Sequence, residues 1–195
     1  MYLAVRQQLS NLSKDEYLVL RELCHVSKNL YNQALYEIRQ EYFRSKKYLN
    51  YYEVYKRLQN TENYSLLQAQ VSQQTLKSVD ENFKSFFGLI KKKMKARIPN
   101  YLDKDGFFKL TIPTVSIKNS KIQLPYSRQY AKEHNRIYLK VPSILKGKEV
   151  KQVWIIPRQN ARFFEVQYIY KVEPKEKKPI KNVLAIDLGI DNLCT

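Results

Sequence analysis

The stretch Leu3-Ala4-Val5-Arg6-Gln7-Gln8 is followed, a few residues later, by Ser13-Lys14-Asp15-Glu16, and these two stretches together decide the predicted fold. The second is a capping box, in which the Ser and Glu side chains satisfy backbone donors of a first helical turn. The first is short and suits a strand. A strand that leads at once into a long helix predicts a helical insertion near the start of a sheet.

A single apolar stripe follows the capping box and predicts a long helix that begins at about Asp15. Its members recur mostly at intervals of three, four or seven residues: Tyr17, Leu20, Cys24, Tyr31, Leu35, Ile38 and Tyr42. A short helix is expected around Tyr52–Leu58 and a second long helix from about Leu66 to Lys95. Two long helices with a short one between them can pack as a small bundle.

Beyond residue 98 the pattern changes to the period-two alternation of strands. All seven prolines lie between Pro99 and Pro179. Six strands are predicted: Phe107–Ile112, Val115–Lys118, Lys121–Leu124, Ile137–Val141, Val150–Ile156 and Arg162–Tyr170. Close spacing of short strands suggests a small antiparallel barrel or sandwich, with the opening strand as a further member. The expected fold class is therefore α+β, a barrel with an inserted helical bundle.

The predicted domain boundaries follow from these changes in pattern. Residues 1–12 form the first barrel strand, 13–98 the inserted helical domain, and 99–172 the rest of the barrel. Residues 173–182 are charged and flanked by proline, which is typical of a linker. Residues 183–195 begin a new domain, because Val183–Leu188 is an apolar run of the kind found in strands buried on both faces.

Composition narrows the class of partner. The chain has 195 residues with 35 Lys and Arg against 18 Asp and Glu, a net charge of +17, which points to a polyanionic partner. No run is long enough to span a bilayer and no signal peptide opens the chain, so we expect no membrane partner and a cytoplasmic location. Cys24 and Cys194 lie far apart, so neither a disulfide framework nor a zinc site is expected.

Asp187 stands out because a carboxylate in an apolar strand is costly to bury unless it is paired, hydrogen-bonded or bound to a metal. It could simply cap the turn before Gly189. The pattern Ile186-Asp187-Leu188-Gly189 also resembles two ribonuclease H-like groups: the first strand of RuvC-type nucleases, whose Asp holds a catalytic metal, and the phosphate-binding hairpin of actin-like ATPases and sugar kinases. In the ATPases this motif normally opens the protein, whereas here it follows about 180 residues, so the nuclease is favoured.

Taken together, the motifs resemble the front part of the TnpB-type transposon-associated, RNA-guided nucleases (annotated transposases), which are related to type V CRISPR effectors. The resemblance covers nearly the whole chain and rests on the order and spacing of several stretches. They are Lys28–Leu35, Gln70–Lys77 with Asn82–Phe87, Arg97–Tyr101, Ile122–Pro125 and Ile186–Ile190.

The resemblance implies a wedge barrel with an inserted recognition domain, and an effector that binds a guide RNA and cuts a double-stranded DNA target through a RuvC site with Mg²⁺. Asp187 would supply one metal ligand, as the catalytic residue of that site. The sequence given ends at Thr195, before the family's later carboxylates, so we expect binding of nucleic acid without cleavage. Two rival functions are a nuclease-dead repressor and an ATPase or sugar kinase.

Most of the candidate binding residues are basic. Lys91, Lys92, Lys93, Lys95 and Arg97 concentrate five positive charges at the predicted end of a helix, where the helix dipole already favours cations. Lys77 and Lys84 could extend that strip along the helix, and Gln73 and Gln74 could reach bases or phosphates. Arg158 and Arg162 flank a predicted hairpin turn, where exposed guanidinium groups suit phosphate. For each of them a solvated or structural side chain is the alternative.

Overall fold

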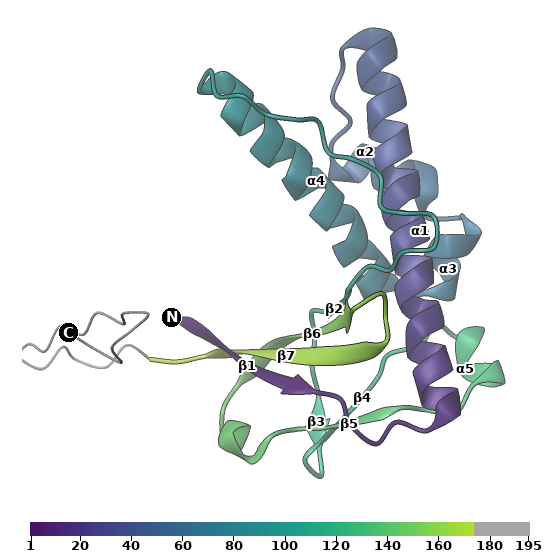
Figure 1. Cartoon of the computed structure of the whole chain (residues 1–195), viewed down its shortest axis with the longest axis vertical. Coiled ribbons are helices and arrows are strands. Elements are labelled where there is room, and N and C mark those ends of the chain that lie inside the picture. The colour runs from purple at the N-terminus through teal and green to yellow at the C-terminus, as the bar shows by residue number, and fades with distance from the viewer. Residues whose placement is uncertain (174–195) are drawn as a thin grey trace, which may run out of the picture.

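The computed structural model describes residues 1–173, which form an α+β fold (Figure 1). The strands are β1 Tyr2–Gln8, β2 Leu110–Ile112, β3 Ile117–Lys118, β4 Lys121–Gln123, β5 Tyr138–Lys140, β6 Val150–Arg158 and β7 Phe163–Lys171. The helices are α1 Lys14–Ser45, α2 Tyr51–Leu58, α3 Glu62–Leu66, α4 Ala69–Lys91 and α5 Tyr130–Glu133, with a 3₁₀ turn, η1, at Ser143–Leu145. Asp187 and almost all of the predicted linker lie outside the described residues.

Strand β1 pairs antiparallel with β7 over its whole length, from Tyr2 opposite Lys171 to Gln8 opposite Glu165. The backbone of Met1 adds two further hydrogen bonds with Val172, as donor and as acceptor. The first and last described strands are thus neighbours, and α1 to α4 lie between them in sequence. This is the insertion that the opening residues predict.

The predicted barrel does not close within residues 1–173, where the strands form two separate antiparallel sheets. One has the order β1-β7-β6-β2 and the other the order β3-β4-β5. Part of the reason lies in Phe107 and Phe108, predicted to begin a strand. The Phe108 amide donates to the Cys24 carbonyl at 3.0 Å, and its ring lies 4.7 Å from that of Tyr31. These residues pack on α1, so β2 keeps only three residues.

Helix α1 starts as its capping box predicts. The Ser13 hydroxyl accepts from the Glu16 amide at 3.1 Å, and the Glu16 carboxylate accepts from the Ser13 amide at 2.9 Å. The helix continues to Ser45, and its apolar stripe is buried from Leu20 to Ile38, with Tyr17 and Tyr42 half-buried at its ends. Lys46 then closes it in the left-handed conformation, with φ of 57°. No helix within residues 1–173 has an apolar stretch long enough to cross a membrane.

The second predicted long helix is α4, which runs from Ala69 to Lys91 and so starts three residues later and ends four residues earlier than expected. The short helix α3 precedes it, and the chain breaks between α3 and α4. Leu67 is extended there, with φ of −82° and ψ of 157°. The Gln68 side chain then caps α4 by accepting from the amides of Gln70 and Val71, at 2.8 and 3.2 Å. A glutamine can act as an N-cap when its longer side chain folds back, which the usual preference for Ser, Thr, Asp and Asn does not anticipate.

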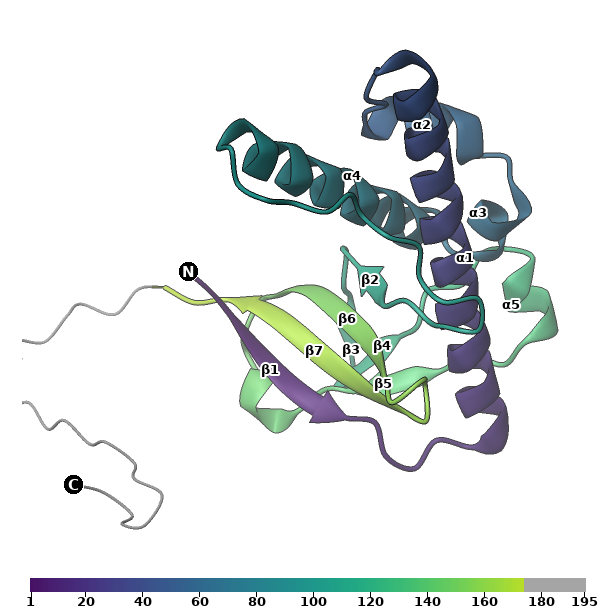
Figure 2. The same cartoon turned by 45° about the horizontal axis from the view of Figure 1, so that its top comes forward.

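The core joins the helices to the larger sheet. Leu20, Leu35 and Ile38 of α1 are buried together with Leu76 and Phe83 of α4. On the sheet side, alternate residues of β7 face inward, and the Phe164 ring contacts the Tyr17 ring of α1 at 5.9 Å. Figure 2 shows α1 beside the sheet, while α4 diverges from α1 at an angle. This packing holds α4 at one end and leaves its other end projecting.

One ion-pair cluster predicts how stability depends on pH. Hydrogen bonds from Arg57, Ser45 and Arg44 lower the pKa of the Glu41 carboxyl from 4.5 to about 2. A carboxyl whose pKa is lowered by folding stabilises the fold above its unfolded pKa, and this stabilisation is lost as pH falls. We therefore expect the urea concentration at the midpoint of unfolding to decrease as the pH is lowered from 4.5 to about 2.

The control for this prediction is the pair E41Q and E62Q, followed by circular dichroism. E41Q should be less stable than the parent at neutral pH and should lack that part of the acid-induced loss. E62Q removes an exposed carboxylate from the first turn of α3 and should keep the loss. An unchanged acid profile in E41Q would show that other carboxyls carry the effect.

Candidate nucleic-acid interface

The end of α4 carries the densest positive charge of the described chain, in the basic segment defined by residues 91–97. The helix ends in a Schellman motif, in which the Lys93 amide donates to Ile90 and the Met94 amide to Leu89, at 2.9 and 3.0 Å. Lys93 occupies the left-handed position, with φ of 57°, where glycine is favoured. The sequence thus has a cation at a position where backbone conformation favours glycine.

All five cations of the basic segment are exposed. None forms an ion pair within residues 1–173. Figures 1 and 2 both show this end of α4 projecting away from the two sheets and from α1. Because unpaired cations close together repel one another, the segment attracts a polyanion. It is the strongest candidate for contact with phosphates.

Apolar side chains share this end of α4. Leu89, Ile90 and Met94 are 38%, 49% and 53% exposed. They lie exposed beside the lysines, where the last turns of α4 diverge from α1 and from the sheets (Figure 1). A surface that combines cations with exposed apolar groups suits a partner that offers both phosphates and base or sugar faces.

Two lysines predicted to extend the strip have partners inside the protein. Lys84 forms an ion pair with the buried Asp80 at 2.6 Å, and this hydrogen bond raises the pKa of Lys84. The same Asp80 accepts from the Tyr48 hydroxyl at 2.6 Å and from the Tyr51 amide at 3.0 Å. Lys77 lies over the Tyr51 ring at 5.5 Å. Both lysines support the packing of α2 on α4, and nucleic-acid binding by them stays a prediction.

Gln73 and Gln74 are half-buried near the start of α4. With a rise of about 1.5 Å per residue, the 18 positions from Gln73 to Lys91 span roughly 27 Å of helix axis. The glutamines therefore lie on the same helix as the basic segment but far from it along the helix axis. Any contact they make with nucleic acid would be with a separate part of the ligand, and it stays a prediction.

Arg158 and Arg162 flank the β6–β7 turn, as the sequence predicts. The Arg158 guanidinium contacts both carboxylate oxygens of Glu165, at 3.1 and 3.2 Å, whereas Arg162 is exposed. The three turn residues between them, 159 to 161, all have left-handed φ. The turn lies beside α1, far from the end of α4 (Figure 1). The structure thus places the two predicted basic sites apart.

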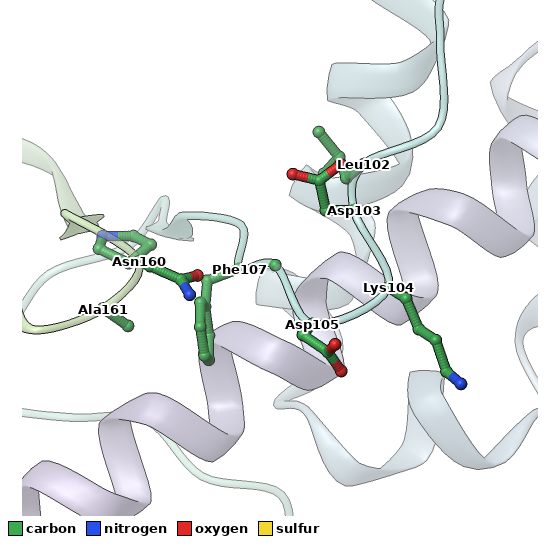
Figure 3. Close-up of a pocket in the computed structure, with 9 residues that line it drawn as sticks. Leu102, Asp103, Lys104, Asp105, Phe107, Asn160 and Ala161 are labelled. Atoms are coloured by element: carbon green, nitrogen blue, oxygen red, sulfur yellow. The ribbon is translucent and has the colours of Figure 1, made fainter.

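A cavity of about 550 Å³ lies between this turn and residues 102–107 (Figure 3). The Asn160 amide points toward the Phe107 ring, while the Lys104 side chain extends away. Two carboxylates, Asp103 and Asp105, also line the cavity, and they disfavour a phosphate there. The cavity therefore adds nothing to Arg158 and Arg162 as a phosphate site.

Sequence reasoning missed a set of α1 side chains that bind the backbone of the chain between α4 and β2. Residues 92–109 cross from the end of α4 to α1 and run along it toward β2 (Figure 1). Side chains of α1 bind its backbone at five positions. The contacts are Arg39 to the Pro99 carbonyl, Asn32 to the Leu102 carbonyl and amide, Lys28 to the Lys104 carbonyl, His25 to the Gly106 carbonyl, and Ser27 to the Lys109 carbonyl.

Lys28 is the unusual member of this tether, the name used below for these five α1 side chains. It is only 3% exposed, and burial lowers the pKa of its ammonium. Arg39 also lies over the Tyr101 ring at 5.0 Å. The signal that could have revealed the tether is helical spacing, since positions 28, 32 and 39 lie on one face of α1. The stretch Lys28–Leu35 therefore has a structural role in the described chain.

No protein-family model and no curated protein matches this chain. The assignment of function therefore depends on the residues and their geometry. Asp187, the one candidate that rests on a catalytic motif, lies outside the described residues. Within residues 1–173, no three His, Cys, Asp or Glu side chains are grouped so that they could hold a metal ion.

Proposed function

We propose that this chain binds nucleic acid, with the basic segment at the end of α4 as its main phosphate contact. The observation that carries the proposal is the set of five exposed cations, none ion-paired within residues 1–173, on a projecting helix end. Phosphate contacts of this type supply affinity without sequence preference. Sequence specificity then has to come from elsewhere.

The resemblance to TnpB-type nucleases supplies a source of that specificity, so the proposal extends to a guide RNA and a double-stranded DNA target. In this proposal the chain is the RNA- and DNA-binding N-terminal part of such an effector. Asp187 would be one ligand of its Mg²⁺, which in that family supplies the activated nucleophile. We assign the described residues to binding, because the exposed cations of the basic segment lie among them.

The test is the salt dependence of binding by the purified chain, measured by fluorescence anisotropy with labelled duplex DNA and single-stranded RNA. If the basic segment contacts up to five phosphates, log K should fall linearly with log salt, with a slope between about −3 and −5. Binding that does not change with salt, or no binding at low salt, would overturn the proposal.

The guide-RNA part needs its own experiment. The chain is purified from its native host without nuclease treatment, washed at high salt, and the retained RNA is sequenced. One defined RNA encoded beside the gene supports a guided effector. Heterogeneous RNA that is lost as salt rises would overturn the guide-RNA proposal and leave only general nucleic-acid binding.

A further inference from the structure

A second cavity, of about 640 Å³, lies at the opposite end of the molecule from the basic segment. Its wall is formed by the inner side of edge strand β1, the β3–β4 turn, the end of β5 and the residues around η1. Figure 1 shows β3 and β5 at the bottom of the molecule and the end of α4 at the top. We call it the lysine-rimmed cavity, after Lys140, Lys146 and Lys148.

The three lysines are exposed, and none forms an ion pair within residues 1–173. Lys148 instead lies over the Tyr170 ring at 4.7 Å. The nearest carboxylate in sequence, Glu149, is already paired with Lys151. The rim therefore carries uncompensated positive charge, which favours an anionic ligand group.

The wall below the rim is partly apolar, and this separates the cavity from a simple anion site. Val141 and Leu145 are buried in it, and Ile117 lines it while 39% exposed. Ser120, Ser143 and Gln7 add polar groups, and the buried Oε1 of Gln7 has no hydrogen-bond partner within residues 1–173. A buried acceptor without a partner is unusual, and a ligand N–H would satisfy it once the Gln7 side chain turns toward the cavity.

The shape of the cavity is set by rigid backbone. Asn119 and Ser120 form the tight β3–β4 turn with φ of 49° and 56°, and the Ser120 carbonyl accepts from the Val141 amide at 2.9 Å. Gly147, with φ of 76°, turns the chain between Lys146 and Lys148, and the Lys148 amide donates to Leu145 at 3.0 Å. A site formed in advance loses little entropy when it binds a ligand.

We propose that the lysine-rimmed cavity accepts one unpaired nucleotide of a single-stranded nucleic acid. Its phosphate contacts the lysines, its base lies against the apolar wall, and an N–H of the base donates to Gln7 Oε1. Inorganic phosphate would leave the apolar wall and Gln7 unused, and a base inside a duplex is stacked and paired and cannot enter. This inference rests on the proposed nucleic-acid binding. It adds a second site, the lysine-rimmed cavity, which selects single-stranded over double-stranded nucleic acid.

The test compares the double variant K146Q/K148Q with the matched control K118Q/K121Q in the full chain. Lys118 and Lys121 are exposed on the same small sheet but do not line the cavity. We expect K146Q/K148Q to lose about tenfold in affinity for a short unstructured RNA. Its affinity for duplex DNA should change no more than that of the control.

A second measurement reports on the cavity directly. Adenosine 5′-monophosphate is titrated into the isotope-labelled chain, and the side-chain amide signals of Gln7 are followed by NMR, with inorganic phosphate as the comparison. Adenosine 5′-monophosphate should shift these signals, and phosphate alone should not. K146Q/K148Q should remove the shift, whereas the K118Q/K121Q control should keep it.

The outcomes separate the two proposals. Equal losses in the two double variants, or equal responses to phosphate and to the nucleotide, overturn the cavity as a nucleotide site and leave the basic segment untouched. A larger loss of duplex DNA binding than of RNA binding also overturns it. No binding of either nucleic acid by the parent chain at low salt overturns the proposed function itself, and the cavity proposal falls with it.

Discussion

Replacing Lys91, Lys92, Lys93 and Lys95 together by glutamine is expected to weaken duplex DNA binding by about two orders of magnitude at roughly 0.1 M salt. The four ammoniums are exposed, and none is ion-paired within residues 1–173, so their removal should not disturb packing. Each phosphate contact that is lost releases one fewer counterion. The slope of log K against log salt should therefore become shallower by about 3 to 4.

The matched control is K14Q/K56Q/K104Q/K132Q, which removes the same charge from four exposed lysines on separate elements. It lowers the net charge of the chain equally but spreads the loss over the surface. We expect a small uniform weakening and a slope changed by less than about one. If the two quadruple variants behave alike, affinity comes from the overall charge, and the end of α4 is not the interface.

Replacing Asn32 by leucine is expected to reduce the free energy of unfolding by about 2 to 3 kcal/mol. The Asn32 amide makes two hydrogen bonds of 2.9 Å with the backbone of Leu102, one as donor and one as acceptor. Leucine leaves both backbone groups without partners in a half-buried setting, and a polar group left unsatisfied costs about 1 to 3 kcal/mol. Chemical denaturation measures the loss.

The control is N29L, three residues earlier on α1. Asn29 is also half-buried, but it borders a surface cavity lined by Tyr36, Arg57 and Thr61, on the side facing α2 and α3. The same chemical change there should alter stability by less than about 0.5 kcal/mol. Hydrogen exchange adds a local readout, since in N32L the Leu102 amide should lose protection. Equal stability of the two variants would show that the tether contributes little.

The tether also explains why residues 92–109 keep one path over α1 without regular structure of their own. Loops normally run over the surface with their backbone groups in water. Here α1 side chains replace water as hydrogen-bond partners of part of this backbone, from Arg39 at the Pro99 carbonyl to Ser27 at the Lys109 carbonyl. The basic segment is therefore held at both ends, by α4 before it and by the tether after it.

Local signals in the sequence determined much of the secondary structure. The Ser13 capping box places the start of α1 because its hydrogen bonds join residues three apart. Alternation predicts β6 and β7, and the turn between them, because successive side chains of a strand point to opposite faces. The positive charge and its concentration at residues 91–97 are also plain in the sequence, because charge depends on residue type and not on contacts.

Tertiary structure decided what local patterns do not contain. The run Phe107–Ile112 alternates like a strand, but Phe108 packs on α1, so only Leu110–Ile112 joins the larger sheet as β2. Lys84 has a carboxylate partner, Asp80, four residues earlier on its own helix, so this ion pair follows from local spacing. Only the fold, however, buries that Asp80 beside Tyr48, whereas Lys91 lies at the exposed end of α4. Short-range hydrogen bonds and charge depend on residues that are close together in the sequence. Which side chains remain available for a ligand also depends on contacts between segments far apart in the chain.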